Sequence, residues 1–476
     1  MPAEPLTLTS PVGAPFGFVV EIEGGGDDAP QPPALNVTGP DPRTGAPKTR
    51  AYRLADWEQP AWVALHQRLA ADFGTRPPGV EVSPREDPGE APRLRPLLTA
   101  NIAPEIRYGY GDPCVVRTEA AGEPPRYHLV VTSNDAPGAF PILRSADLER
   151  WEFVGCAFPP GRKPRWAAGA PVISDFWAPE LHRVGEEFWL CFSARRPDRS
   201  LAIGIARSPS PEGPFETPDE PLIGGGVIDA HLLVDDGEVH LFWKADNNGI
   251  WPGLLDALLH QRPELIARLF PGEADQRTLS LLSALQPWTA RLEPMRRFLV
   301  HGPLIEAVTD DLPGFKARLQ AAGAAAAPAA AIAASLRTPV YAQRVSEDGR
   351  SLVGEPTLVL ENDQLWEAHL IEGSWIWREA GRSYFFYSGN DFATPQYGIG
   401  VAVADHPLGP YRKAGAPLLR SSRRWIAPGH PSVALAPDGR PHLFLHAYPP
   451  GEIGYKAFRA LLSVPLRFDG DRVMLE

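Results

Sequence analysis

The stretch GDPCVV, at residues 111–116, is followed after a short gap by a second apolar and aromatic stretch, YHLVVTSN, at residues 127–134. The same two-part pattern occurs five times: an acidic residue or a histidine heads a short apolar run, and a tight turn leads into a second run. The heads are Asp112, Glu180, Asp229, Glu372 and His430, and the second runs begin at Tyr127, Phe188, Val239, Ser383 and Pro441. Successive second runs begin about 50 to 60 residues apart, except for one long interval between the third and the fourth.

A strand-rich repeat of roughly this length is typical of a β-propeller, in which each repeat forms one blade. We therefore predict an all-β fold, a five-bladed β-propeller, over residues 98–476. The long interval has helical apolar spacing and an Ala-rich stretch, which predict a helical insertion over about 249–336, between blades three and four. In such a propeller the heads of the inner strands meet at one end of the axis, so these heads define the candidate site.

Residues 1–97 do not carry the repeat and are predicted to form an N-terminal extension. The extension contains a strand at 17–24, an amphipathic helix at 56–74 and a linker rich in Pro and charge at 75–96. We expect it to pack against the propeller. The helical insertion would serve as a lid over the site or as an oligomer contact, and the sequence does not separate these two roles.

Composition and charge argue against several classes of protein. The net charge of −12 disfavours a nucleic-acid partner, because such binding needs a basic face. The three cysteines, Cys114, Cys156 and Cys191, have no metal-binding spacing and predict neither a zinc site nor a disulfide framework. No apolar run reaches the ~18 residues of a membrane span, and the N-terminus lacks the features of a secretion signal. We therefore expect no membrane partner and a cytoplasmic location.

Three of the heads are carboxylates that a propeller would gather around its axis: Asp112, Asp229 and Glu372. Taken singly, Asp112 before Pro113 is typical of a turn and Asp229 of a turn cap, whereas Glu372 lies in an apolar segment that rarely buries an unpaired charge. Taken together, they are expected at equivalent positions of blades one, three and four. Burial and mutual repulsion would separate their pKa values, leaving one carboxyl protonated and another ionised. Two such groups on either side of an acetal bond can hydrolyse a glycoside.

Five segments resemble glycoside hydrolase family 43, the inverting β-xylosidases, α-L-arabinofuranosidases and arabinanases with five-bladed propellers. The segments are YGDPCVV, FWAPELHRVGEEFWL, GVIDAHLLVDDGEVHLFW, LIEGSWIWREAGRSYFFYSGN and PGHPSVALAPDG. The resemblance covers about 98–476, apart from the insertion. It implies a glycosidase that cleaves arabinose- or xylose-containing glycosides or oligosaccharides with inversion and requires no cofactor.

The resemblance also implies roles for particular residues. Asp112 matches the family's general base, Glu372 its general acid, and Asp229 the aspartate that orients the acid and raises its pKa. His430 resembles an axial histidine that in some members lies beside a bound cation, often calcium, and a plain hydrogen-bonding role is the alternative. For Glu180, in the segment similar to WAPE, the neighbouring aromatic residues themselves predict a structural role in blade packing. The residues expected to line the substrate pocket are Trp177, Trp375, His231 and His430.

The chain departs from the family pattern at two positions that commonly hold Pro, where it has Ala230 and Ser374. Three alternatives stay open. The first is a sugar-binding propeller without catalysis, and the second is a related five-bladed glycosidase that acts on another sugar. The third is an assembly module that works through the helical insertion. A retaining fructosidase is disfavoured, because the chain lacks a WMNDPNG-like start.

Overall fold

The computed structural model describes residues 5–25, 31–79, 94–119, 122, 124–169, 173–323 and 326–476. Most of the expected Pro-rich linker, 75–96, lies outside these residues. The chain divides into two compact units, each built from two segments: Met1–Val80 with Asn247–Arg337, and Glu81–Asp246 with Thr338–Glu476. We call them the helical unit and the sheet unit. No helix in the described part of the chain combines the length and hydropathy that a membrane span requires.

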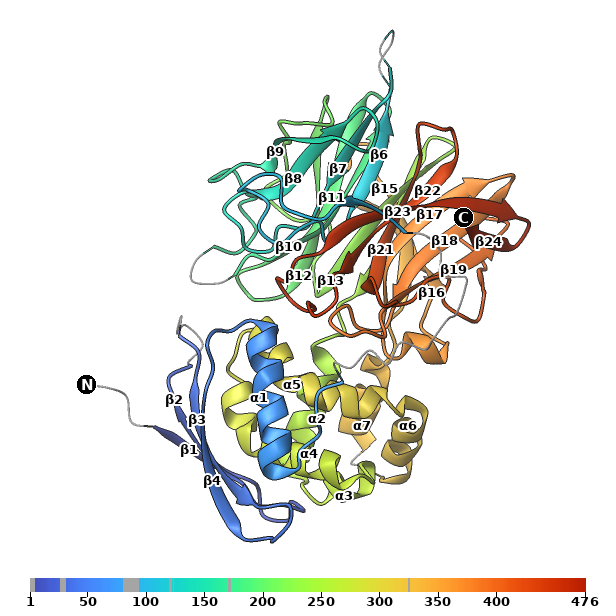
Figure 1. Ribbon diagram of the computed structural model, residues 1–476. Coiled ribbons are helices and arrows are strands. Elements are labelled where there is room, and N and C mark those ends of the chain that lie inside the picture. The colour runs from blue at the N-terminus through green and yellow to red at the C-terminus, as the bar shows by residue number, and fades with distance from the viewer. Residues whose placement is uncertain are drawn as a thin grey trace. The chain divides into compact units, whose positions relative to one another are not determined.

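The helical unit combines one antiparallel sheet with seven α-helices among its described residues. The sheet strands are β1 (Leu6–Thr9), β2 (Val19–Glu23), β3 (Ala34–Pro40) and β4 (Pro47–Arg53), hydrogen-bonded in chain order. The helices are α1 (Gln59–Phe73), α2 (Ile250–Gln261), α3 (Leu265–Leu269), α4 (Glu273–Thr289), α5 (Pro294–Thr309), α6 (Leu312–Ala321) and α7 (Ala326–Ser335). Helices from the middle of the chain thus lie beside the N-terminal strands (Figure 1).

The core of the helical unit joins the N-terminal region to the insertion. Alternate residues of β2 and β3 are buried, such as Val20 and Leu35, and they form one cluster with apolar residues of α1, α2, α4 and α5. The Arg76 backbone N–H donates to Thr278 Oγ1 at 2.7 Å. The expected division at residues 97 and 98 therefore needs correction: the N-terminal region shares its core with the insertion, a pairing that no sequence repeat announces.

The sheet unit contains five antiparallel sheets among the described residues. The first comprises β6 (Cys114–Thr118), β7 (Arg126–Val130), β8 (Ala139–Ser145) and β9 (Trp151–Phe158), and the second β10 (Phe176–Val184), β11 (Glu187–Arg195) and β12 (Leu201–Ser208). The third comprises β13 (Val227–Asp235), β14 (Glu238–Ala245), β15 (Val340–Val345) and β16 (Leu352–Leu360). The fourth comprises β17 (Ile371–Glu379), β18 (Arg382–Gly389), β19 (Gly398–Ala404) and β20 (Arg412–Lys413), and is preceded by a short 3₁₀ helix, η1 (Leu365–Glu367). The fifth comprises β21 (Ile426–Leu435), β22 (Pro441–Tyr448), β23 (Ala460–Asp469) and β24 (Arg472–Leu475), with β5 (Arg95–Leu98) paired to β23.

The helical insertion interrupts a single sheet. Strands β14 and β15 are hydrogen-bonded neighbours, with Trp243 opposite Tyr341, although α2 to α7 lie between them in the chain. The insertion was expected between blades three and four, and that placement is wrong by two strands. The segment from Val340 completes the third sheet because its apolar residues pair with β14.

The first strands of the five sheets contact one another in a closed cycle: β6 with β10, β10 with β13, β13 with β17, β17 with β21, and β21 with β6. The pairing of β5 with β23 joins an early segment of the sheet unit to its last sheet. The starts of all the first strands are thereby brought around one axis, although they are far apart in the sequence. This cycle positions the candidate site.

Candidate active site

Each first strand begins at a kink of the backbone. The register of β10, β13, β17 and β21 shifts near the strand start, as in a β-bulge. One residue at each kink, and one just before β6, has a positive φ: Asp112, Ala178, Asp229, Gly373 and His430, with φ of 52°, 45°, 58°, 60° and 51°. Such backbone is strained for residues other than glycine, and it is common at functional sites.

This alignment corrects the expected equivalence of the three carboxylates. Asp112, Asp229 and His430 occupy the same position, but Glu372 comes one residue earlier because Gly373 takes the kink in its sheet. Glu180 lies two residues after the kink at Ala178. The five heads therefore occupy three different positions relative to the kinks, and each head has its own surroundings.

Asp112 is an ionised carboxylate held by a cation. Its Oδ1 accepts from Arg459 Nη1 at 2.9 Å, and its Oδ2 accepts from the Thr132 hydroxyl at 2.5 Å. The Nδ1 atoms of His430 and His446 each lie 3.4 Å from Oδ1. Burial alone would raise the pKa of Asp112, but Arg459, followed by the two histidines and the Thr132 hydroxyl, holds it well below the usual value.

Two glycines make room for this arrangement. A Cβ on Gly111 would lie 1.9 Å from the Arg459 guanidinium, so only glycine lets the cation approach Asp112. A Cβ on Gly429 would lie 1.8 Å from the ring of Tyr397, which accounts for the Gly before His430 in the GHPSVAL segment. Both glycines are needed because a neighbouring side chain occupies the space of their missing Cβ.

Glu372 is a buried carboxyl with a raised pKa. It is 8% exposed, its Oε1 accepts from the Tyr397 hydroxyl at 2.7 Å, and its Oε2 lies 3.4 Å from the Lys244 ammonium. Burial is the main cause that raises its pKa, to about 7, and the charge of Asp229 acts in the same direction. Lys244, Tyr397 and His430 oppose the shift. The carboxyl is therefore substantially protonated near neutral pH.

Asp229 links the third and fourth sheets. Its Oδ2 accepts from the backbone N–H of Gly373 at 3.0 Å, and its own N–H donates to Ser193 Oγ at 3.1 Å. The carboxylate thus holds the backbone directly after Glu372. The structure thus places Asp229 next to the backbone that carries Glu372, the residue predicted to be the acid.

His430 lies between the two groups. Its N–H donates to Ser388 Oγ at 2.7 Å, and a Cβ on Gly373 would come within 3.1 Å of its Nδ1. A calcium ion prefers six to eight oxygen ligands. Around His430 the nearby carboxylate oxygens of Asp112 are already bound by Arg459 and Thr132. This donor set does not match a calcium ion held directly by protein atoms.

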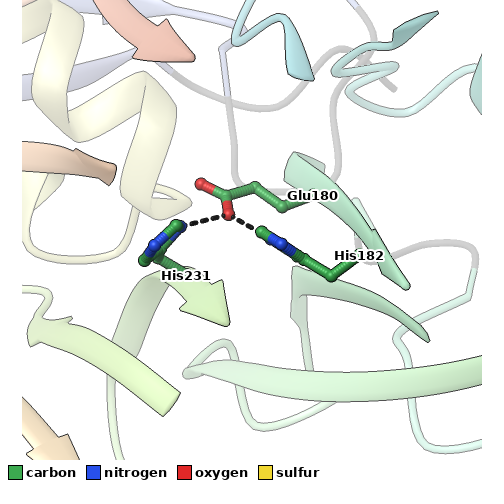
Figure 2. Close-up of side chains that lie close together, drawn as sticks. All are labelled: Glu180, His182 and His231. Atoms are coloured by element: carbon green, nitrogen blue, oxygen red, sulfur yellow. Dashed lines mark hydrogen bonds and ion pairs between the residues drawn. The ribbon is translucent and has the colours of Figure 1, made fainter. Parts of the chain in front are cut away.

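A second buried network surrounds Glu180, as Figure 2 shows. Its Oε2 lies 2.8 Å from His182 Nε2 and 2.8 Å from His231 Nδ1. These three side chains have the spacing of a metal site. However, His231 Nε2 accepts from the Ile376 backbone N–H at 3.1 Å, so the ring proton must be on Nδ1, and that nitrogen donates to Glu180 instead of binding a cation. The cluster is better described as a hydrogen-bonded triad.

Besides His430, the residues predicted to line the substrate pocket lie in two places: Trp177 lies beside Arg195, whereas His231 and Trp375 lie at the triad around Glu180. Trp177 is half-buried, donates from Nε1 to Asn134 Oδ1 at 2.8 Å and lies against the Arg195 guanidinium. Both ring nitrogens of His231 are engaged, which leaves none for a substrate, contrary to expectation. Trp375 is 6% exposed, stacks on His182, and lines a cavity of about 440 Å³ that none of Asp112, Asp229 and Glu372 lines.

Sequence reasoning missed the second strands as a source of site residues. The sixth residue of each second run is Thr132, Ser193, Lys244, Ser388 or His446. Four of them accept a hydrogen bond from the kink of the next sheet in the cycle, at 2.7 to 3.1 Å. Aligning the second runs would have singled out this column, because in every run a polar residue follows three consecutive apolar or aromatic ones. Arg459 lies outside the repeats and gave no such signal.

A search of protein families matches residues 103–268 and 332–473 to the model for glycosyl hydrolases family 43. The matched ranges omit 269–331, which holds most of α4 to α7. A xylosidase/arabinosidase 43A of Humicola insolens is 26% identical over 283 residues, 58% of this chain and 67% of that protein. A beta-xylosidase of Xylanibacter ruminicola is 24% identical over 302 residues, 63% of this chain and 73% of that protein.

Solved structures share the architecture. A thermostable family-43 glycoside hydrolase has a TM-score of 0.53 and 26% identity, over 77% of this chain and 93% of that one. An endo-1,4-beta-xylanase from Bacteroides thetaiotaomicron has a TM-score of 0.50 and 19% identity, over 81% of this chain and 97% of that one, and supports the fold alone.

Proposed function

The chain belongs to family 43 of the glycosyl hydrolases, and on that premise we propose that it hydrolyses glycosides of xylose or arabinose with inversion at the anomeric carbon. It is a glycosidase, an enzyme that cleaves O-glycosyl bonds. The names of its relatives, xylosidase/arabinosidase and beta-xylosidase, support this choice of sugars. The closed cycle of first strands supports a five-bladed propeller as the scaffold.

One observation carries the proposal: two carboxyls that both interact with His430 have pKa values moved in opposite directions. Arg459 keeps Asp112 ionised, and burial keeps Glu372 protonated to about pH 7. His430 connects their surroundings, because its ring approaches both Asp112 and Gly373. An ionised base and a protonated acid are what inverting hydrolysis requires of its two carboxyls.

In the proposed reaction the Glu372 proton moves to the glycosidic oxygen as the bond between that oxygen and the anomeric carbon breaks. A water attacks the anomeric carbon from the opposite face and gives its proton to Asp112. The products are a free sugar with inverted configuration and an alcohol. Asp112 then loses its proton to solvent and Glu372 regains one, so that the enzyme returns to its starting state.

Asp229 has two parts in this proposal. Its charge raises the pKa of Glu372, and its contact with the Gly373 N–H holds the adjacent backbone in place.

Inversion also requires room for a water, which corresponds to carboxyls about 6.5–9.5 Å apart. Trp177 lies directly before the kink at Ala178, as Glu372 lies directly before the kink at Gly373. We expect Trp177 to border the sugar.

The test is a panel of aryl α-L-arabinofuranosides and β-D-xylosides, with the first sugar product followed by NMR. We expect turnover of at least one series and a first-formed anomer opposite to that of the substrate. Retention of configuration would overturn the mechanism. Absence of turnover on every member, with sugar binding intact, would favour the alternative of a non-catalytic propeller.

A further inference from the structure

The hydrogen bonds at the five kinks follow a rule with one exception. In four sheets the kink N–H donates to the sixth residue of the second run in the preceding sheet of the cycle. These pairs are Asp112 with His446 Nδ1, Ala178 with Thr132 Oγ1, Asp229 with Ser193 Oγ and His430 with Ser388 Oγ. The exception is the fourth sheet, which carries the acid.

For the kink of the fourth sheet the corresponding residue is Lys244, on β14 of the third sheet. An ammonium group has three donors and no acceptor, so it cannot accept from the Gly373 N–H. That N–H donates to Asp229 Oδ2 at 3.0 Å instead, and the Lys244 ammonium lies 3.4 Å from Glu372 Oε2. A lysine thus stands where the other sheets have a hydroxyl or an imidazole. As a result, the Gly373 N–H bonds to Asp229, and an ammonium group lies beside Glu372.

Lys244 cannot act by touching the substrate. The residue is 1% exposed, and Glu372 stands 8% exposed beside it. A buried cation at this distance interacts strongly with a carboxylate, because little water screens the two charges. The other groups that act on Glu372 are Tyr397, whose hydroxyl donates to Oε1, and the charges of Asp229 and His430.

We propose that Lys244 is the positioning residue of the acid: its ammonium orients the Glu372 carboxyl and stabilises the carboxylate that remains once the proton has moved to the leaving group. This inference rests on the proposed function. Burial and Asp229 both favour the protonated carboxyl, so these two influences alone would slow the transfer of its proton to the leaving group. Lys244 supplies the opposing influence at the moment of transfer.

The test is the dependence of kcat/KM on pH in Lys244→Met, which removes the charge at similar length. Activity requires protonated Glu372, so it falls as pH rises through the pKa of that carboxyl. Without the cation this pKa rises, and the alkaline limb should move up by about one to three pH units. The rate should fall most for substrates with poor leaving groups. Lys244→Arg should keep the limb close to its original position.

The chain offers a matched control in Lys413, whose Nζ lies 2.8 Å from the fully buried Glu367. Lys413→Met also removes a lysine from a buried glutamate, and it should lower the melting temperature without moving the limb. An unmoved limb in Lys244→Met, with a similar loss of stability, would overturn the inference. If Lys244→Met does not fold, Lys244→Gln applies the same test with a polar, uncharged side chain.

A failure here is distinct from a failure of the proposed function. If Glu372→Gln is inactive on poor leaving groups and the Lys244→Met limb stays in place, only the role of Lys244 is lost. If Glu372→Gln keeps the original rate, the acid itself is misassigned and the inference falls with it.

Discussion

Glu372 and Glu180 are both buried glutamates near the start of a first strand, and burial raises the pKa of both. Their partners differ. Glu180 Oε2 is bound by two imidazoles, whereas Glu372 meets one hydroxyl, one ammonium and the charge of a second carboxylate. Burial alone therefore does not distinguish Glu372, the proposed acid, from Glu180. The difference lies in whether the carboxyl has groups around it that can assist both of its protonation states.

The strongest test of the difference between Glu372 and Glu180 is to replace each with glutamine. Glu372→Gln should lower kcat/KM by about 10²–10⁴-fold on substrates with poor leaving groups, because the proton donor is gone. Activated aryl glycosides should lose much less, since their leaving groups need little protonation. Steady-state rates along a leaving-group series measure this, and a uniform loss across the series would argue against an acid role.

Asp112→Asn should be nearly as damaging. The amide cannot take the proton from water, and Arg459 is left beside a neutral group, so we expect a loss of about 10²-fold or more. The loss should be independent of the leaving group, in contrast to that of Glu372→Gln. Rates on the same series provide the measurement, and a leaving-group dependence would exchange the two assigned roles.

Glu180→Gln should spare the chemistry and cost stability. One amide group would face two imidazole N–H donors, and the disrupted buried hydrogen bonds should cost about 1–3 kcal/mol of unfolding free energy. Chemical denaturation measures that loss, and kcat/KM should stay within about threefold of the original. A drop in rate as large as that of Glu372→Gln would show that the triad takes part in catalysis.

The pH profile of the unaltered enzyme should show the same contrast. The pKa of Asp112 lies well below its usual value, so this carboxylate stays ionised in acid. Activity should therefore persist at acidic pH until the protein unfolds. As pH rises, Glu372 loses its proton at about 7, and activity should fall there. The alkaline limb should disappear in Glu372→Gln measured on activated substrates and remain in Glu180→Gln.

The smallest expected effect is that of Tyr397→Phe. Its hydroxyl donates to Glu372 Oε1 and favours the ionised form, so its removal should raise the pKa of the acid and move the alkaline limb upward by less than one unit. Tyr387→Phe is the control, because its hydroxyl donates to Glu367 at 2.7 Å in the same way. A downward shift in Tyr397→Phe would contradict the assigned direction.

The repeats made much of the sheet unit predictable. Each head and each second run lies where a strand start or a strand was expected, because apolar alternation and tight turns are local properties. Asp112, Asp229 and Glu372 were predicted to be site residues from their motifs, and each lies at or next to the kink of its sheet. The one-residue offset of Glu372 was not predicted, since it depends on the kink at Gly373, and a β-bulge has no simple sequence signal.

Other features depend on contacts between distant segments. Lys244, Arg459 and Tyr397 act on the carboxylates only because the sheets close into a cycle, and none of them lies in a head motif. The same reason explains the helical unit. Its N-terminal strands and later helices share a core, but their sequences carry no common pattern that would announce it.

The two-segment build of the helical unit has a consequence for synthesis of the chain. Strands β1 to β4 and helix α1 emerge early, yet apolar residues such as Val20, Leu35 and Leu65 find their partners only after helices α2 to α5 have left the ribosome. In the meantime, more than a hundred residues of the sheet unit are translated. We expect the nascent chain to expose this apolar surface for many seconds, at ~5–20 residues per second, and so to depend on chaperones.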